Sequence, residues 1–262
     1  MTRPSDPVGY PADPVGHRAS RAAEPPSAPA DPASRHLAGQ PVDPPSAGSA
    51  ARVAMLHTVP ALAGPLGELA AEVRPGVQVV HFADESLLQD TIAHGGPPPH
   101  VLRRLVAYAA FAKESGAGTL LVTCSSIGEA AERARPFAEL PILRIDQPMA
   151  EEAVEAGARV GVLATLSATL GPTTRAVRRA AARRGLEREI VPHLCEGAFE
   201  ALRAGDAARH DALVLRGFAG LAGKVDVVVL AQVSMARIVT RAGGGVPVLS
   251  SPRSGVAQLA TA

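Results

Sequence analysis

The sequence predicts an α/β fold of two similar pseudo-symmetric lobes, each a parallel sheet flanked by helices, with a site in the cleft between them. The chain repeats itself: residues 52–58 (RVAMLHT) align with residues 159–165 (RVGVLAT), and residues 119–127 (TLLVTCSSI) align with residues 227–235 (VVVLAQVSM). Segments that repeat in register indicate two copies of one α/β unit. Strand-like apolar runs also alternate with longer helical patterns, which is typical of parallel sheets. The continuous apolar run at residues 225–231 suits a strand that is covered on both faces.

The first 50 residues differ in composition from the rest of the chain. They contain 11 of the 24 prolines and almost no large apolar side chains. Such a segment cannot bury enough apolar surface to offset the entropy that ordering costs. We therefore expect a disordered tail at residues 1–50, a first α/β lobe at residues 51–157 and a second at residues 158–262. The two lobes together hold about 210 residues, which is enough for a sizeable core.

The strands of the first half are predicted from short runs of β-branched and other apolar residues, and the helices from apolar residues three or four positions apart. The expected strands are Val53–His57, Val77–Phe82, Thr119–Thr123 and Ile142–Ile145. The expected helices lie near Leu62–Val73, Ser86–Ala93, Val101–Glu114, Ile127–Arg133 and Met149–Ala156. Residues 126–129 fit a capping box, which would start the fourth of these helices.

The second half follows the same order. Its expected strands are Val160–Ala164, Glu189–Leu194, Val225–Ala231 and Val246–Ser250. Its expected helices lie near Pro172–Arg184, Gly197–Ala204, Ala207–Ala222, Met235–Arg241 and Arg253–Ala260. Pro172 is expected in the first turn of its helix, where proline is favoured. The second strand–helix step repeats as well, because residues 80–85 (VHFADE) align with residues 191–196 (VPHLCE).

Composition narrows the classes of partner and location. The formal net charge is +1, and Lys113 and Lys224 are the only lysines, so nothing indicates nucleic acid or an anionic membrane as a partner. The sequence has no apolar run of about 18 residues and no charged-then-apolar leader pattern, which predicts a soluble, cytoplasmic protein. Two cysteines, one in each half, give no disulfide framework, and both are expected to be free thiols.

Polar residues follow four of the predicted strands. Ligands of open α/β sheets gather at the carboxyl ends of strands, and two lobes facing each other would bring these ends to one cleft. The four ends are His57–Thr58, Cys124–Ser126, Thr165–Ser167 and Gln232–Ser234. The repeat relates the first end to the third and the second to the fourth. Gln232 therefore occupies the position that Cys124 has in the first half.

Cys124 is the candidate catalytic residue. Free backbone N–H groups at a helix start lower the pKa of a thiol from about 8.5, and a thiolate is both a nucleophile and a general base. Position alone is equally consistent with a small buried hydrophobic residue, but the polar neighbourhood favours a functional one. Gln232 can donate and accept hydrogen bonds but cannot shuttle protons at neutral pH.

Hydroxyl groups near Cys124 are candidates for binding a carboxylate. Ser125 and Ser126 adjoin free backbone N–H groups, although capping alone would explain Ser126. Thr165 and Ser167 offer either a second clamp or a plain N-cap segment, and Ser234 is either a cap or a ligand contact. The expected substrate-binding residues are Thr58, Ser125, Ser126, Thr165, Ser167, Gln232 and Ser234.

Among the histidines, His57 is the candidate proton shuttle, because it precedes Thr58 at a strand end. For His57, His81 and His193 a hydrogen-bonded or partly exposed side chain is the more frequent role, and no Asp or Glu completes a metal site at known spacing. Cys195 is expected to be incidental. The phosphate-binding motifs GxxxxGKS/T and GxGxxG and the nucleophile elbow GxSxG are absent from the sequence.

The residues at these strand ends resemble the aspartate/glutamate racemase superfamily, which includes glutamate, aspartate and hydantoin racemases, maleate isomerase and arylmalonate decarboxylase. The segments that carry the resemblance are Thr123–Ile127, Gly161–Thr169, Glu196–Asp206 and Val229–Met235. The resemblance covers about residues 51–262. It implies two similar α/β lobes with the site between them, and chemistry that uses no metal, pyridoxal or nucleotide cofactor.

In the racemases of this superfamily two cysteines flank the α-carbon of the substrate, where one removes a proton and the other returns one to the opposite face. Cys124 falls on the first position and Gln232 on the second, so this chain departs from the two-thiol pattern. The decarboxylase branch works with a single cysteine in the second lobe, so the chain departs from that arrangement as well. The family is often dimeric, which makes a homodimer an assembly to test.

Three functions follow from these observations. The first is a cofactor-independent racemase-family isomerase, with one cysteine acid/base, that transfers a proton at the carbon next to the carboxylate of an amino acid or related small acid. A single-cysteine decarboxylase (a lyase) of a malonate-type acid is its close alternative. The second uses Cys124 as a covalent nucleophile with His57 as its base. The third is a catalytically silent carboxylate-binding homologue.

Overall fold

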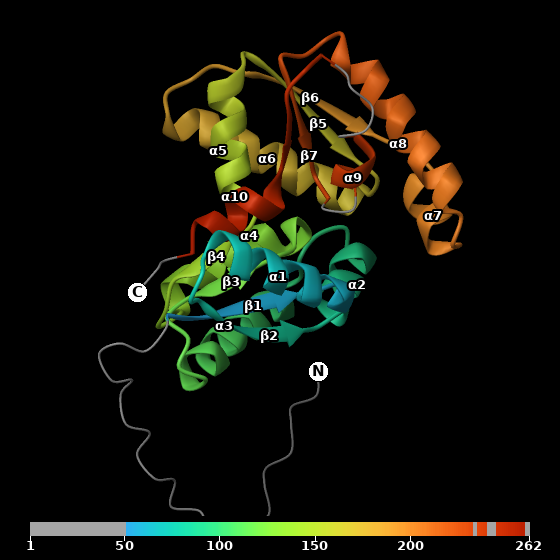
Figure 1. The fold of residues 1–262 in the computed structure, drawn as a ribbon. Coiled ribbons are helices and arrows are strands. Elements are labelled where there is room, and N and C mark those ends of the chain that lie inside the picture. Colours follow the sequence, from blue (N-terminus) through green and yellow to red (C-terminus); the bar gives the residue numbers. More distant parts are fainter. Residues whose placement is uncertain (1–50, 233–234, 240–244, 260–262) are drawn as a thin grey trace, which may run out of the picture. The chain divides into compact units, whose positions relative to one another are not determined.

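The computed structural model describes residues 51–232, 235–239 and 245–259. This part of the chain forms two four-stranded sheets, each flanked by helices (Figure 1). The observed architecture confirms the predicted α/β class with two similar lobes. The expected tail at residues 1–50 lies outside the described residues.

Both sheets are parallel and share one strand order. The first sheet runs β2-β1-β3-β4 and the second β6-β5-β7-β8, with every neighbouring pair parallel. The strands are β1 (Arg52–His57), β2 (Gln78–Ala83), β3 (Leu120–Val122), β4 (Ile142–Arg144), β5 (Arg159–Ala164), β6 (Glu189–Leu194), β7 (Val227–Leu230) and β8 (Val248–Ser250). All eight predicted strands are present, and each end lies within about two residues of its predicted position.

The described helices come in the same order in both halves. They are α1 (Ala63–Val73), α2 (Ser86–Ala93), α3 (Pro99–Glu114), α4 (Gly128–Ala134), α5 (Gln147–Ala156), α6 (Ser167–Arg183), α7 (Ala198–Arg203), α8 (Ala207–Ala222), α9 (Ala236–Val239) and α10 (Ser251–Ala257). Short 3-10 turns lie at η2 (Pro60–Leu62), η3 (Ser125–Ile127) and η4 (Arg135–Phe137). Helix α1 corresponds to α6 and α5 to α10, so each helix of the first half has a counterpart in the second half.

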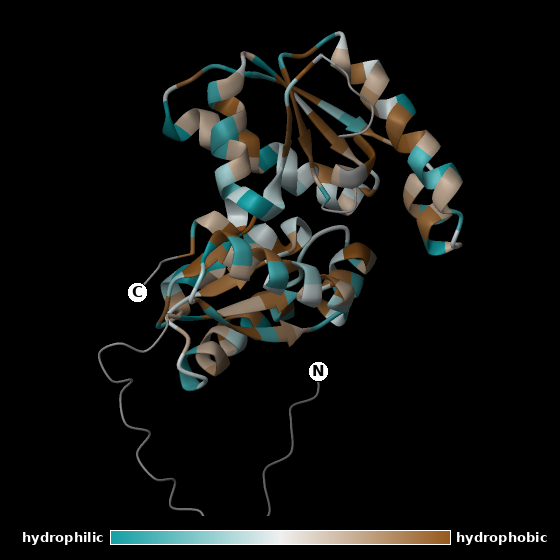
Figure 2. Ribbon diagram, viewed as in Figure 1, coloured by the Kyte–Doolittle hydropathy of each residue, from teal (hydrophilic) through white to brown (hydrophobic). Residues whose placement is uncertain are grey.

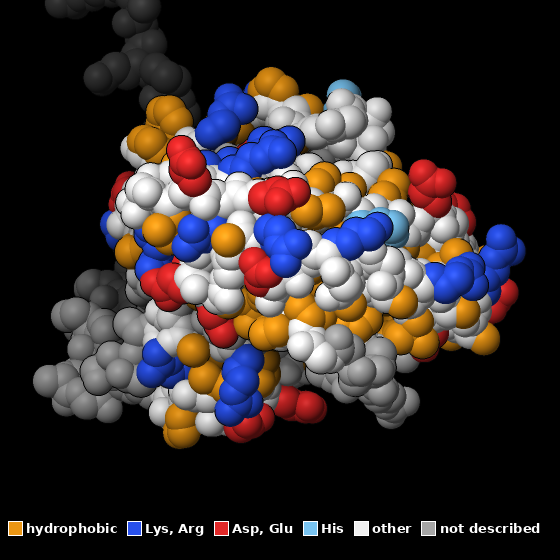
Figure 3. Space-filling view, turned by 90° about the horizontal axis from the view of Figure 1, so that it is seen from above, with side chains coloured by type: hydrophobic (Ala, Val, Ile, Leu, Met, Phe, Trp, Pro, Cys, Tyr) orange, Lys and Arg blue, Asp and Glu red, His pale blue; other side chains and the backbone are white. Residues whose placement is uncertain are grey.

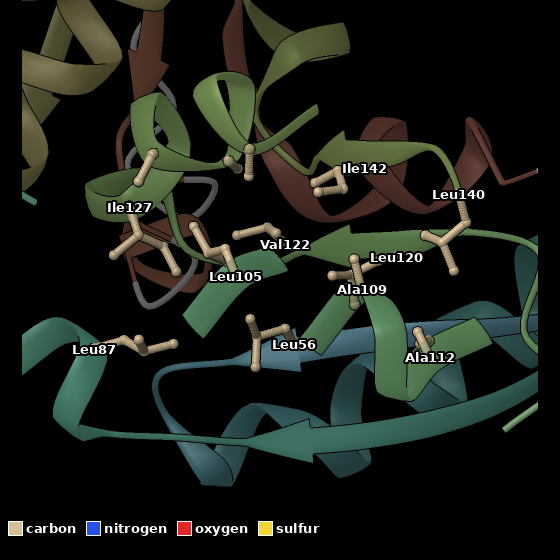
Figure 4. Close-up of a cluster of buried hydrophobic side chains, with 14 of the residues drawn as sticks. Leu56, Leu87, Leu105, Ala109, Ala112, Leu120, Val122, Ile127, Leu140 and Ile142 are labelled. Atoms are coloured by element: carbon tan, nitrogen blue, oxygen red, sulfur yellow. The ribbon is translucent and has the colours of Figure 1, made fainter. Parts of the chain in front are cut away.

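The central strands β1, β3, β5 and β7 are buried on both faces. Their apolar composition, which Figure 2 shows as brown ribbon, fits this burial. In β1, Leu56 packs in a cluster formed with α3 and α4 (Figure 4), whereas Met55 packs in a cluster on the opposite face with α1. This division follows from the alternation of side chains along a strand. Burying a leucine such as Leu56 completely stabilises the fold by roughly 1.5–3 kcal/mol.

The last helix of each half packs against the sheet of the other half. Met149 and Val154 of α5 lie in the core of the second sheet, together with residues of β5, β7 and α6. Val256 of α10 lies in the core of the first sheet, with Val53 and Met55 of β1 (Figure 1). The helix that ends each half thus completes the core around the sheet of the other half.

One predicted helix start and one predicted helix cap are wrong. Helix α6 begins at Ser167, so Pro172 lies inside the helix rather than in its first turn. Ser126 does not cap α4, since the N-cap residue is Ile127 and no side chain caps it. The hydroxyl of Ser126 instead lies 3.1 Å from the hydroxyl of Thr169 in α6. A hydrogen bond between the lobes thus replaces the local cap that the sequence pattern indicated.

Surface charge is mixed on the face shown in Figure 3, where Lys and Arg side chains alternate with Asp and Glu. Among the described residues, Glu129 of α4 pairs with Arg175 and Arg179 of α6, which links helices of the two lobes. In the same part of the chain, no helix combines the length and the apolar character that crossing a bilayer requires.

Candidate active site

A cavity of about 270 Å³ lies where the carboxyl ends of the central strands of both sheets meet. Its polar lining comes from residues that follow β1, β3 and β7 and from the starts of α6 and α10. These polar residues are Thr58, Thr123, Cys124, Ser125, Ser126, Thr169, Gln232 and Ser251. The remaining described lining is apolar and consists of Val59, Leu62, Leu88, Leu166, Phe199, Leu202 and Ala231. Such a pocket, with a few convergent polar groups, is the usual form of a small-molecule site.

Cys124 lies in the wall of this cavity. It follows β3 with extended backbone (φ −123°, ψ 117°) and immediately precedes the turn η3. Its side chain is partly exposed, and the thiol is free. The strand end therefore places a nucleophilic group in the cavity wall, while part of the side chain packs against the core of the first lobe.

Ser125 and Ser126 follow Cys124 and are buried, yet both line the cavity. The hydroxyl of Ser126 meets Thr169 across the lobes at 3.1 Å, so it is held in place from the second lobe. Thr58 lines the cavity from the end of β1. These hydroxyl groups can hydrogen-bond a carboxylate without any nearby cation.

Gln232 lines the cavity at the end of β7, but its amide is engaged by Thr165. Its Nε2 donates to the Thr165 hydroxyl at 2.8 Å, and its Oε1 accepts from the Thr165 backbone N–H at 2.8 Å. Thr165 is buried and does not line the cavity. The two hydrogen bonds fix which faces of the amide remain available to a ligand.

His57 lies behind the cavity wall and is fully buried. Its Nδ1 lies 3.0 Å from the hydroxyl of Thr123, and its Nε2 lies 2.9 Å from Nδ1 of His81. The Thr123 hydroxyl also donates to the carbonyl of Leu56 at 2.9 Å. Since a hydroxyl has one hydrogen and a carbonyl only accepts, His57 must donate to Thr123 from Nδ1 and accept from His81 at Nε2.

Burial, and secondarily the neighbouring His81, lower the pKa of His57 from 6.5 to about 4. His57 is therefore neutral at pH 7. His81 is exposed at the surface, but its ring is partly covered, and this partial burial lowers the pKa of His81 as well. A chain of hydrogen bonds thus joins an exposed histidine to a threonine that lines the cavity. Within the described part of the structure it has no equivalent in the second lobe, because Ala164 and Pro192 take the corresponding positions.

The structure brings together Thr58, Cys124, Ser125, Ser126 and Gln232 of the predicted site residues. It places Thr165, Ser167 and His57 outside the lining: Thr165 supports Gln232, Ser167 is exposed at the start of α6, and His57 reaches the cavity only through Thr123. Ser234 lies outside the described residues.

Other lining residues were not predicted from the sequence. Thr169 lies two residues beyond Ser167, and the hydroxyl run of that segment was the available signal. Two further lining residues are related by the repeat: when residues 80–85 are aligned with 191–196, Leu88 falls on Phe199, and both line the cavity. Apolar residues on short helices resemble core residues in a sequence, so this pair carried no mark of a site.

Cys195 lies away from the cavity, in the core of the second lobe. Burial raises its pKa to about 11, so it remains a protonated thiol at neutral pH. Its sulfur fills the space beside Gly217 of α8, where an added Cβ would lie 2.5 Å from it. The described residues contain no group of three His, Cys, Asp or Glu side chains placed to hold a metal ion.

Solved structures share this two-lobed arrangement. The chain is similar to a Yersinia pestis protein assigned to the Asp/Glu racemases (15% identity, TM-score 0.64, covering 79% of this chain and 96% of that one). It is also similar to glutamate racemase RacE1 from Bacillus anthracis (16%, TM-score 0.58, 79% of each chain) and to aspartate racemase from Picrophilus torridus (13%, TM-score 0.58, 77% and 89%). At these identities the likeness shows the fold. No curated protein sequence matches the chain significantly.

The sequence profile of the Asp/Glu/Hydantoin racemase family matches residues 54–259, which is most of the chain and all of the site. The fold and the cavity between strand ends thus define a two-lobed α/β enzyme. The chain belongs to the Asp/Glu/hydantoin racemase family and is an isomerase of the racemase type.

Proposed function

We propose that this enzyme transfers a proton at the carbon next to a carboxylate, without a cofactor, and that Cys124 is its acid/base. The observation that carries the proposal is the partly exposed thiol of Cys124 in the wall of a cavity lined by serine and threonine hydroxyls. A thiolate can remove the proton, and hydroxyl donors aimed at the carboxylate stabilise the negative charge that develops on it.

The hydroxyls of Thr58, Ser125 and Ser126 are the proposed carboxylate partners. Thr58 follows β1, and the two serines lie in the turn η3 after β3, so the fold itself positions these hydroxyls. Ser126 is additionally held by Thr169 of α6. In this proposal Gln232 orients the substrate from the other side, and Thr165 acts through Gln232 rather than on the ligand. Ser167 and Ser234 also remain proposed ligand contacts, and a structure with a bound acid would test them.

The second candidate is decarboxylation of a malonate-type acid, and the engagement of Gln232 by Thr165 favours it. Two-thiol racemisation needs a second acid on the opposite face of the carbon, and an amide held by two hydrogen bonds does not supply a proton. In decarboxylation the bond to one carboxylate breaks, CO₂ leaves with the electron pair remaining on the carbon, and the thiol of Cys124 protonates that carbon. The thiolate then regains a proton from solvent.

His57 is retained as a proposed proton shuttle, acting through Thr123. The hydrogen bonds run from His81 to His57 and from His57 to Thr123, which lines the cavity. To pass a proton into the cavity, the Thr123 hydroxyl has to turn away from the Leu56 carbonyl, to which it donates. These hydrogen bonds lie in the same lobe as Cys124, so a proton delivered along them would return to the thiolate of Cys124. The covalent-nucleophile function has less support, because both ring nitrogens of His57 are engaged and its ring does not line the cavity.

Proton exchange tests the proposal directly. The protein is incubated in deuterated water with a panel of amino acids and substituted malonates, and loss of the α-proton signal is followed by NMR. We expect exchange or CO₂ release with at least one acid, and a loss of about 100-fold or more in Cys124→Ala. Cys195→Ala is the matched control, because that thiol is buried away from the cavity.

Chiral chromatography of the product distinguishes racemisation from decarboxylation. Full activity in Cys124→Ala would contradict every mechanism proposed for this thiol. A protein that binds small acids but never exchanges their α-protons would be a catalytically silent carboxylate-binding homologue.

Location and assembly complete the proposal. We place the enzyme in the cytoplasm, where both of its free thiols would stay reduced. Its ligand is a small carboxylic acid rather than a nucleic acid or a membrane surface. A homodimer is the proposed assembly, and light scattering of the purified full chain tests it.

A further inference from the structure

Five apolar residues that line the cavity are defined here as the apolar wall: Val59, Leu62, Leu88, Phe199 and Leu202. The residues of this wall come from around the turn η2 and from helices α2 and α7, whereas the polar groups come mainly from the strand ends. Among the described residues that line the cavity, none has a charged side chain. The described lining of the cavity thus offers hydroxyl groups and hydrocarbon but no charge.

Both lobes build this wall with equivalent helices. Leu88 lies in α2, which follows β2, and Phe199 lies in α7, which follows β6 at the corresponding point of the repeat. The two positions have thus kept large apolar side chains in both copies of the unit, although Cys124 and Gln232 differ between the copies. The shared feature of the two half-sites is the hydrocarbon surface.

Parts of the apolar wall are left uncovered in the structure. Val59 is 42% exposed and Leu202 is 39% exposed. A ligand that covers them gains the free energy of removing apolar surface from water. A charged group placed there would instead lose its hydration with no partner of opposite sign.

We infer that the substrate carries an apolar substituent, of branched aliphatic or phenyl size, on the carbon that Cys124 serves. The inference rests on the proposed function and specifies its substrate class. The carboxylate attached to that carbon meets the serine and threonine hydroxyls, and the substituent meets the apolar wall. A cavity of about 270 Å³ has room for both groups. The acidic side chains of aspartate and glutamate fit the apolar wall poorly, because it offers them no cation.

Matched pairs of acids test the inference. Leucine is compared with glutamate, and phenylmalonate with carboxymethylmalonate, for α-proton exchange or CO₂ release, with each rate corrected for the rate in Cys124→Ala. We expect the apolar member of at least one pair to react with a kcat/KM at least about tenfold higher than its acidic counterpart. Binding of the same four acids to Cys124→Ala is measured by isothermal titration calorimetry, so that the preference is read even without turnover.

The variants Leu202→Arg and Leu215→Arg provide the matched comparison. The two leucines are 39% and 38% exposed, but Leu202 lines the cavity from α7 whereas Leu215 lies on α8 outside the lining. Leu202→Arg should lower kcat/KM or the affinity for the apolar acid about tenfold or more. The preference for the apolar acid over the acidic member of the same pair should therefore become smaller. Leu215→Arg should leave both unchanged.

The outcomes separate this inference from the function on which it rests. Equal or faster reaction of glutamate and carboxymethylmalonate would overturn the substrate class and leave proton transfer by Cys124 standing. Absence of any exchange, combined with tighter calorimetric binding of the apolar acids, would overturn the proposed function and support the inferred ligand class. Tighter binding of the acidic members, or no binding of any of the four acids, would overturn the inference.

Discussion

The side-chain amide of Gln232 binds Thr165 twice, at the hydroxyl and at the backbone N–H, each at 2.8 Å. The position that repeats Cys124 in the second lobe therefore holds a group that fixes the end of β5 against the end of β7. Any substitution there removes this structural contact, whether or not it also adds chemistry. A thiol introduced at residue 232 therefore needs a second variant for comparison, one that loses the same contact and adds no thiol.

Gln232→Cys should racemise a substrate faster than Gln232→Ala by about tenfold or more, because it alone adds a second thiol to the lining of the cavity. Both variants lose the two hydrogen bonds to Thr165. The free energy of unfolding should therefore be lower in both by about 1–2 kcal/mol. Chiral chromatography measures the first effect, and urea unfolding measures the second. Equal racemisation rates in the two variants would show that a second thiol is not what this site lacks.

Alkylation should distinguish the two thiols. Cys124 is partly exposed in the cavity, whereas burial raises the pKa of Cys195 to about 11. At pH 8 only about one Cys195 side chain in a thousand would be thiolate, and it is also shielded from reagents. Iodoacetamide followed by mass spectrometry should therefore label Cys124 in the native protein, and Cys195 only after unfolding in urea. Labelling of Cys195 at the same rate as Cys124 would contradict the buried placement.

The buried His57 should make stability depend on pH. Its pKa is about 4 in the folded chain, against the ordinary value of 6.5 for a solvated histidine, so the unfolded chain binds more protons between these values. The free energy of unfolding should therefore fall as the pH drops from about 6.5 toward 4, by at most about 3 kcal/mol from this group. Urea unfolding at a series of pH values measures the slope. His57→Gln should flatten it, and an equally steep slope in that variant would exclude His57 as its source.

His81 should matter for turnover if the chain of hydrogen bonds delivers protons. His81→Gln should lower kcat about tenfold or more, leave KM unchanged, and alter the pH profile of kcat. Imidazole in the buffer should restore part of the rate, because His81 is exposed. The exposed His94 lies outside the chain of hydrogen bonds, so His94→Gln is the control. A fall in stability without any change in kcat would leave His81 with a structural role alone.

Gly128 should be needed for the packing of a buried ion pair. Arg144 makes two hydrogen bonds to Asp146, at 2.8 and 2.7 Å, and both residues are 1% exposed. A Cβ at Gly128 would lie 2.6 Å from the guanidinium of Arg144, which cannot move without breaking the pair. Gly128→Ala should therefore destabilise the protein by about 1–3 kcal/mol.

Gly64→Ala is the matched control, because an added Cβ in α1 meets nothing within 4 Å. It should leave stability unchanged or raise it by up to about 1 kcal/mol, as alanine favours a helix over glycine. Urea unfolding of the two variants gives the comparison. Similar stabilities would mean that Arg144 has more room than its buried position indicates.

Much of the candidate site could be predicted because parallel strands present their carboxyl ends at one edge of a sheet. Thr58, Cys124, Ser125, Ser126 and Gln232 were placed by that rule, and the structure puts them around one cavity. The rule does not say which way the chain turns after the strand. Helix α6 begins at Ser167, and its first turn leaves that side chain exposed while Thr169 meets Ser126. A sequence pattern records residue type but not such turns.

Local patterns in the chain were enough to establish the two-lobed α/β fold, because apolar periodicity reports which faces of an element are covered, and the repeat reports that the unit occurs twice. They also placed the candidate site at the strand ends, five of whose residues line one cavity. Three relationships came from tertiary packing alone: α5 and α10 exchange sheets, Thr165 engages Gln232, and Leu88 and Phe199 share one wall. Those relationships join residues far apart in the chain. They depend on the packing of whole elements, which no local pattern encodes.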